Sequence, residues 1–311
     1  MTATALVIGC GGTIGGAWAV AALDELVRRT GWNPADATVL QGTSAGAELV
    51  TLLAAGYTPA DLVDMQVGTS DDPVLREHIA ATPASLPPVP GVHRLMPSTV
   101  WTRRGGHAAL SGIAPRGRGD AAWLHRLADA ASGPDGRLGH PGARLVAYRV
   151  DDGRRIAFGA PGAPPATPGE ALRASWAVPG WMPPVTIDGR RHLDGGTAST
   201  ASVDLVGPDE AELIYLITPM ASAAGVRAPG PGGLLEDRLL RRPMSRVLAR
   251  EVADVRARGT RVVHIAPRAT DMAALGSHFM NRKRRREAFA ASRGTVVDTV
   301  RQALEGDRGD E

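Results

Sequence analysis

The chain has 311 residues, of which 43% are hydrophobic and 22% are charged, and its net charge is +3 at pH 7. This length and hydrophobic content favour a globular protein with a large core and exclude extensive disorder. The small net charge, and the lack of a basic motif interleaved with aromatic residues, argue against a nucleic-acid partner.

Cysteine usage and the N-terminal residues bear on the cellular compartment. Cys10 is the single cysteine, so no disulfide can form within the chain, which fits a reducing compartment. No basic segment precedes the short apolar run at the N-terminus, and no apolar run approaches the ~18 residues of a membrane span. We therefore expect a cytoplasmic protein that is at most peripheral to a membrane surface. The oligomeric state is not predicted.

The first 55 residues predict two consecutive strand-turn-helix units. Residues 3–9 are apolar on both faces, which is typical of a buried parallel strand, and residues 15–30 have apolar positions at helical spacing. Residues 37–41 predict a second strand and residues 44–55 a second helix that ends at Gly56. Because such crossovers are right-handed, the two strands should lie parallel in one sheet.

Residues 70–140 have a different composition, rich in proline, glycine and arginine. This composition predicts an irregular cap with one or two short helices, because loops of this length in a compact domain are usually functional or mobile. Trp101 and Met96, with the arginines nearby, either form an interfacial lid or pack on the core.

Regular structure returns after the cap and completes one predicted α/β domain that spans the whole chain. Strands at 144–150 and 154–158 form a hairpin turned at Asp152-Gly153, and a second hairpin turns at Asp188-Gly189. Further strands are expected at 212–217 and 261–265. Helices are expected at 168–176, 234–257 and 284–304.

The pentapeptide Gly42-Thr43-Ser44-Ala45-Gly46 is the strongest catalytic signal. In Gly-x-Ser-x-Gly, a tight turn between strand and helix raises the serine hydroxyl above the sheet edge. The N-terminus of the following helix adds backbone N–H groups and a dipole that favours negative charge. Ser44 is therefore a candidate nucleophile; the alternative is an ordinary tight turn.

A second glycine-rich turn, residues 9–16, follows the first strand and is the candidate oxyanion loop. Acyl transfer builds negative charge on the carbonyl oxygen, and N–H groups of Gly11, Gly12 and Ala45 are candidates to bind it. The alternative is a dinucleotide-binding loop. However, the glycine spacing departs from Gly-x-Gly-x-x-Gly, and Gln41 stands where an acidic residue would end the second strand.

Asp194 is the candidate general base that a serine nucleophile requires. It ends a predicted strand and precedes Gly195-Gly196, a sharp turn that would present the carboxylate at the sheet edge. An aspartate that only caps the turn is the alternative. His264 is a rival base, and His93, His107 and His192 are weaker ones. The sequence lacks well-spaced metal ligands, so neither a metal nor a cofactor is predicted.

Taken together, these motifs resemble the patatin-like phospholipase family. The resemblance rests on Gly11-Gly12-x-x-Gly15, Gly42-x-Ser44-x-Gly46 and Asp194-Gly195-Gly196, with residues 174–185 similar to the segment before the family's aspartate. It is strong over residues 5–57 and 143–200, looser over 212–304, and does not cover the cap.

The resemblance implies a three-layer α/β/α fold with a mainly parallel central sheet. It implies a Ser44–Asp194 dyad without histidine, and an oxyanion loop at Gly11 and Gly12 that closes at Gly15. The implied activity is hydrolysis of acyl-ester lipids, of the phospholipase A or esterase type.

Three departures from the family pattern leave an alternative open. Ile14 stands where the family often has Arg or Lys, Cys10 replaces a glycine, and residues 199–202 replace the Asn and Pro that often follow Asp-Gly-Gly. Cys10 is expected to be a small buried residue. The alternative is a catalytically weak or inactive scaffold that binds lipid or a protein partner.

Overall fold

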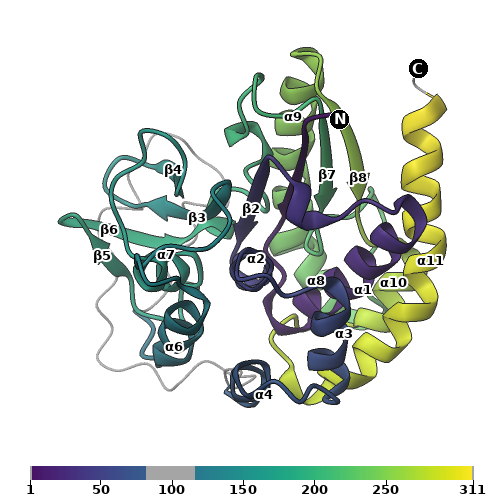
Figure 1. The fold of residues 1–311 in the computed structure, drawn as a ribbon. Helices are drawn as coiled ribbons and strands as arrows, with labels where there is room; N and C mark the ends of the chain where they lie inside the picture. The colour runs from purple at the N-terminus through teal and green to yellow at the C-terminus, as the bar shows by residue number, and fades with distance from the viewer. Residues whose placement is uncertain (1, 82–115, 310–311) are drawn as a thin grey trace.

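The computed structural model describes residues 2–81 and 116–309, and the remaining residues are drawn as a grey trace in Figure 1. The described chain forms one mixed sheet of eight strands with helices on both of its faces. This confirms the predicted α/β class with a mainly parallel central sheet.

Five parallel strands form the centre of the sheet, in the order β3-β2-β1-β7-β8. They are short and almost wholly buried, which explains their near-continuous apolar sequences. The strands are β1 (Thr4–Ile8), β2 (Val39–Thr43), β3 (Ala143–Arg149), β7 (Leu213–Ile217) and β8 (Arg261–Ile265). The second strand thus begins and ends two residues later than the sequence predicted.

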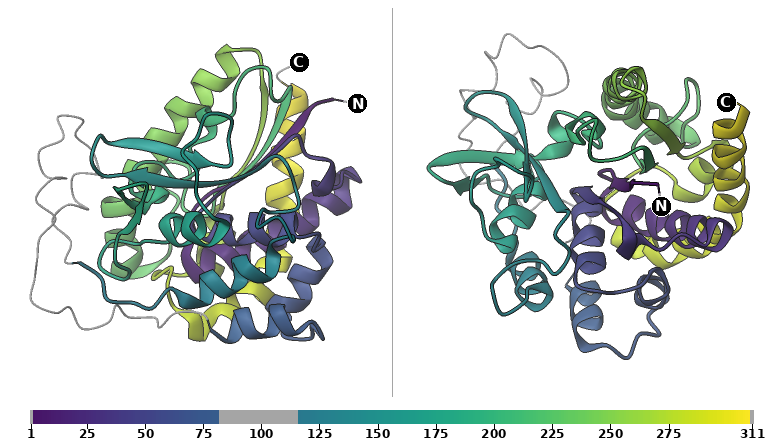
Figure 2. Two further views of the ribbon diagram at one scale, coloured as in Figure 1. Left: turned by 60° about the vertical axis from the view of Figure 1, so that its left-hand side comes forward. Right: turned by 45° about the horizontal axis from the view of Figure 1, so that its top comes forward.

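Alternate residues of the central strands face two separate hydrophobic cores. Leu6 and Leu40 belong to the core beneath helices α1 (Gly12–Thr30), α2 (Ala45–Ala54) and α11 (Arg285–Gly309). Val7 and Val39 belong to a smaller core beneath helix α9 (Arg242–Ala257). Figure 2 shows α1 and α11 on one side of the sheet and α9 on the other. The fold is therefore the three-layer arrangement that was expected.

Three antiparallel strands extend the sheet beyond β3. They are β4 (Arg154–Phe158), β5 (Val185–Ile187) and β6 (Arg190–Asp194), the two hairpins anticipated from Asp152-Gly153 and Asp188-Gly189. Residues 145–146 of β3 pair with both β2 and β4, and residues 147–149 pair with both β4 and β6. Because a strand has only two edges, β2 and β6 must share one edge of β3.

The remaining helices cover the α1 face of the sheet or connect its strands. Trp123 and Leu124 of α6 are buried in the main core, so α6 is part of the packed domain. Trp101, Met96, His93 and His107 lie outside the described residues. The helices on this side are α3 (Pro59–Val67), α4 (Pro73–Ala80), α6 (Ala122–Ala131), α7 (Pro168–Ser175) and α10 (Ala269–Leu275).

The long helix expected at 234–257 is longer and less regular. It begins as α8 (Gly230–Glu236), passes through a π-helical segment at Asp237–Arg241 and continues as α9. Short 3₁₀ turns lie at Pro34–Asp36, Gly195–Thr197, Val203–Leu205 and Arg282–Arg284. Within the described residues, no helix combines the length and apolarity needed to cross a bilayer.

Candidate active site

Strands β2 and β6 bring Ser44 and Asp194 together by running toward each other along one edge of β3. Strand β2 ends at Thr43, opposite Val146, and β6 ends at Asp194, opposite the next residue, Ala147. Ser44 directly follows β2. Two residues 150 positions apart in sequence therefore meet at the ends of two strands that face each other along β3.

The backbone of Ser44 is held in a strained turn between β2 and α2. Its φ is 56° and its ψ is −121°, a conformation that residues with a side chain rarely adopt. The Ser44 N–H donates to Ser175 Oγ at 2.9 Å, and Ser175 Oγ donates to the Val146 carbonyl at 2.6 Å. Ser175 thus fixes the turn to β3, a role that the spacing of the sequence motifs did not reveal.

The two glycines of the Ser44 motif are required by close packing. A Cβ on Gly42 would lie 2.3 Å from the Gly46 carbonyl oxygen, and a Cβ on Gly46 would lie 2.1 Å from the Ile8 carbonyl oxygen. Both distances are far inside van der Waals contact with backbone atoms that cannot move independently. The turn can therefore lie against the end of β1 only with glycine at both positions.

Asp194 is buried, and its carboxylate is hydrogen-bonded to Ser44. The Ser44 hydroxyl donates to it, and the Gly196 N–H donates to Oδ1 at 2.7 Å. Burial raises the pKa of Asp194 from 3.8 to about 7, and these two hydrogen bonds only partly oppose that rise. A carboxylate with a pKa near 7 accepts a proton readily at neutral pH, as a general base must.

Gly11, Gly12 and Ala45 lie at the N-termini of the two helices that converge on Ser44. Within residues 2–81 and 116–309, no hydrogen bond uses the N–H groups of these three residues. Gly12 has φ +56°, and a Cβ there would lie 2.5 Å from the Phe279 ring. Ile14 is buried in the main core. Its uncharged side chain does not line the pocket above Ser44. Favourable electrostatics for an oxyanion would therefore come from the positive N-terminal ends of the α1 and α2 helix dipoles.

The pocket above Ser44 has a volume of about 380 Å³ and apolar walls. Its floor contains Ser44, Asp194, Gly11, Gly12 and Gly196. Its walls come from segments far apart in sequence: Val178, Pro179, Trp181, Met220, Leu239, Leu240, Met244 and Phe279. Sequence reasoning did not identify these wall residues, because no spacing relates them.

Cys10 also lines this pocket and is 5% exposed, so the expectation of a small buried residue is confirmed. Burial, and then the Asp194 carboxylate, raise the pKa of the Cys10 thiol to about 12. The thiol is therefore protonated at neutral pH and is not a nucleophile.

The two histidine candidates within the described residues, His264 and His192, do not line the pocket above Ser44. His264 is on β8, lines a different cavity, and its Nε2 is 2.7 Å from Thr218 Oγ1. Burial lowers its pKa to about 4, so it is neutral. His192 is buried on β6 and packs edge-on against Phe158. Among the described residues, no three His, Cys, Asp or Glu side chains are placed to hold a metal ion.

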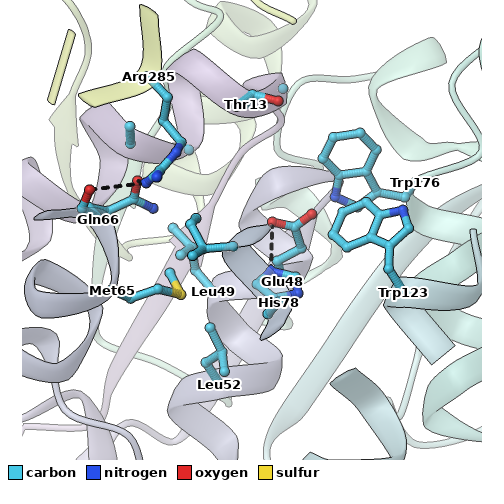
Figure 3. A pocket seen from close by; sticks show the side chains of 14 residues that line it. Thr13, Glu48, Leu49, Leu52, Met65, Gln66, His78, Trp123, Trp176 and Arg285 are labelled. Atoms are coloured by element: carbon cyan, nitrogen blue, oxygen red, sulfur yellow. Dashed lines mark hydrogen bonds and ion pairs between the residues drawn. The ribbon is translucent and has the colours of Figure 1, made fainter. Parts of the chain in front are cut away.

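A second, polar cavity lies beneath the first turn of α1 (Figure 3). Figure 3 shows the Glu48 carboxylate pointing toward His78, with the indoles of Trp123 and Trp176 beside them. His78 Nε2 lies 3.5 Å from Glu48 Oε2, and burial raises the pKa of Glu48. The cavity measures only about 20 Å³, which admits nothing larger than water. The contact between Glu48 and His78 therefore links α2, the helix that follows Ser44, to α4.

Comparison with known proteins places the chain in a family. Residues 6–206 match the family model described as patatin-like phospholipase. Because this match spans well over half of the chain, the protein belongs to the patatin-like phospholipase family, whose members are typically serine lipid hydrolases.

One similar solved structure is that of VipD from Legionella pneumophila. It has 12% sequence identity and a TM-score of 0.40, and the match covers 96% of this chain and 67% of that chain. No curated protein sequence matches this chain.

Proposed function

We propose that the protein is a serine acyl hydrolase that cleaves lipid esters with Ser44 as nucleophile and Asp194 as general base. The observation that carries this proposal is that Ser44 and the buried Asp194 carboxylate lie together in the lining of one apolar pocket, and burial raises the pKa of that carboxyl to about 7. A triad is not supported, since His264 lies in another cavity.

The reaction begins when Ser44 Oγ attacks the ester carbonyl and passes its proton to Asp194. The resulting oxyanion accepts hydrogen bonds from the N–H groups of Gly11, Gly12 and Ala45, each worth about 10²–10³ in rate. The tetrahedral intermediate then breaks its bond to the alcohol, which takes the proton from Asp194. This leaves an acyl group on Ser44.

Deacylation repeats these steps with water as the nucleophile. Asp194 accepts a proton from the water as its oxygen attacks the acyl carbonyl, and it returns the proton to Ser44 Oγ as the fatty acid leaves. The same carboxylate therefore acts as base and acid in both halves of the reaction.

The pocket supports a lipid acyl chain as the group that is bound. Its walls are aliphatic and aromatic, and Ser44 and Asp194 are part of the same lining. A volume of about 380 Å³ lies within the usual range of small-molecule sites. Burial of an acyl chain there would place the ester carbonyl over the serine.

The test is covalent labelling with a fluorophosphonate probe, which reacts with activated serines. The native protein should be labelled and Ser44→Ala should not be, whereas Ser132→Ala, at the end of α6, serves as a matched control that stays labelled. Labelling of Ser44→Ala at the native rate would overturn the assignment.

A second measurement tests the base. Asp194→Asn should lower kcat for p-nitrophenyl esters by about 10⁴, the scale seen when a catalytic aspartate is neutralised in serine hydrolases. An unlabelled native protein that binds lipid tightly, with no turnover at any acyl length, would instead identify an inactive lipid-binding member of the family.

A further inference from the structure

The helix that forms one rim of the pocket exposes two large apolar side chains. Leu235, near the end of α8, is 59% exposed, and Leu239, in the π-helical segment, is 51% exposed. Leu239 also lines the pocket wall. Apolar surface therefore continues from the pocket onto the outer face of this helix, where solvated leucines carry an unfavourable free energy.

This helix reverses the usual distribution of polar and apolar residues. Glu236, Asp237 and Arg241 are buried, while the leucines beside them face solvent. Arg241 Nε donates to Glu236 Oε1 at 2.7 Å, and Arg241 Nη1 donates to the Pro219 carbonyl at 2.9 Å. The buried Arg241–Glu236 ion pair thus fixes the inner face, so the helix cannot rotate to bury its leucines without breaking this pair.

In the segment that carries the leucines, residues 221–250, the exposed charged residues are all arginines. Between residues 221 and 250 the only acidic residues are Glu236 and Asp237, and each is buried in an ion pair. Among the described residues, no carboxylate pairs with Arg238, which lies beside Leu239. The exposed charged residues of this stretch are Arg227, Arg238, Arg242, Arg246 and Arg250.

We propose that the face formed by Leu235, Arg238, Leu239 and Arg242, hereafter the rim face, docks on an anionic lipid bilayer. The leucines insert into the acyl region, and the guanidinium group of Arg238 binds headgroup phosphate, whereas the guanidinium group of Arg242 is already paired with Asp237. The charge pattern favours this occupant, because a bilayer surface presents apolar chains beneath negative charge. Docking would hold the pocket mouth against the membrane that contains the substrate.

The proposal rests on the proposed function only in taking this pocket as the lipid site, and its test requires no turnover. Co-sedimentation of the Ser44→Ala protein should show binding to vesicles of phosphatidylcholine mixed with phosphatidylglycerol, and weaker binding to phosphatidylcholine alone. Added salt should weaken the binding. Arg238→Gln should reduce the affinity about fivefold, and Leu235→Glu about tenfold or more.

Matched controls separate docking from general effects of charge and apolarity. Val67→Glu alters another exposed apolar residue, on α3, and Arg154→Gln removes an exposed arginine on β4; both should bind vesicles like the parent. Circular dichroism should show that all variants fold. With Ser44 intact, Leu235→Glu should keep its activity on a soluble short-chain ester, because Leu235 does not line the pocket.

Two outcomes overturn the proposal. One is binding to anionic vesicles that Leu235→Glu and Arg238→Gln leave unchanged, or reduce no more than the controls do. The other is a native dimer that Leu235→Glu converts to a monomer without a change in vesicle binding, which would assign the rim face to a second copy of the chain. Absence of esterase activity with intact vesicle binding would count against the proposed function alone.

Discussion

Replacement of Asp194 by asparagine should stabilise the protein at high pH while abolishing its activity. Burial raises the pKa of Asp194 from 3.8 to about 7, so the ionised form is disfavoured in the folded state relative to the unfolded chain. At about 1.4 kcal/mol per pH unit, this difference amounts to about 4 kcal/mol.

The sign follows from proton binding. Between pH 3.8 and about 7 the folded state keeps a proton on Asp194 that the unfolded state has lost, so the native protein loses stability as pH rises through this window. Below 3.8 both states are protonated and the effect vanishes. Asparagine mimics the neutral form at every pH, so the variant should not show this loss.

Urea denaturation of both proteins at pH 4 and pH 8 measures the effect. The free energy of unfolding should be nearly equal at pH 4, and the variant should exceed the native protein by about 4 kcal/mol at pH 8. An equal difference at both pH values would refute the argument that burial sets the pKa of Asp194. An Asp71→Asn variant, changed at an exposed aspartate, controls for loss of an aspartate in general.

Four further outcomes follow. The kcat/KM for a soluble ester should rise about tenfold per pH unit up to pH ~7 and then level off, since only ionised Asp194 accepts the proton; a profile flat from pH 5 to 8 would contradict this. His264→Ala should keep most of the esterase activity, and a loss as large as that of Asp194→Asn would revive a triad. Gly46→Ala should lower the free energy of unfolding by about 3 kcal/mol or more, because its Cβ would strike the Ile8 carbonyl; a native-like urea midpoint would count against that packing. Arg241→Gln should lower the free energy of unfolding by about 3–5 kcal/mol, because it leaves Glu236 buried and unpaired. Arg126→Gln, which removes an exposed ion pair, should lower it by at most about 1 kcal/mol; equal losses in the same urea assay would contradict the argument that burial makes the Arg241–Glu236 pair costly to break.

The sequence was sufficient to predict those strands and turns whose structure depends on residues close together in the chain. The apolar runs predicted every central strand, and the Gly-rich turns marked the ends of β1 and β2 where Gly12 and Gly46 leave no room for a Cβ. The fold class followed from the same alternation of strands and helices. Strand boundaries shifted by at most two residues, whereas the first helix begins three residues earlier and the last helix ends five residues later than expected. The π-helical segment left no trace in the hydrophobic pattern.

The residues of the candidate site also fall into those that local motifs predict and those that only the fold brings together. Ser44 and the oxyanion loop could be proposed from their own turns, whereas the sequence offered both Asp194 and His264 as bases. The head-on approach of β2 and β6 along β3 places only Asp194 against the serine, and burial alone brings its pKa near 7. Neither effect is encoded within a single segment.

The sequence by itself determined which turns are tight, which strands are buried and which residue carries the hydroxyl, because these depend on steric and apolar properties of neighbours in the chain. Tertiary structure decided which candidate base lies beside Ser44, which residues form the walls of the pocket, and the exposure of Leu235 and Leu239 on a helix whose acidic residues are buried. Those features arise from contacts between distant segments and from the removal of charged groups from water, and the free energy of both depends on the whole fold.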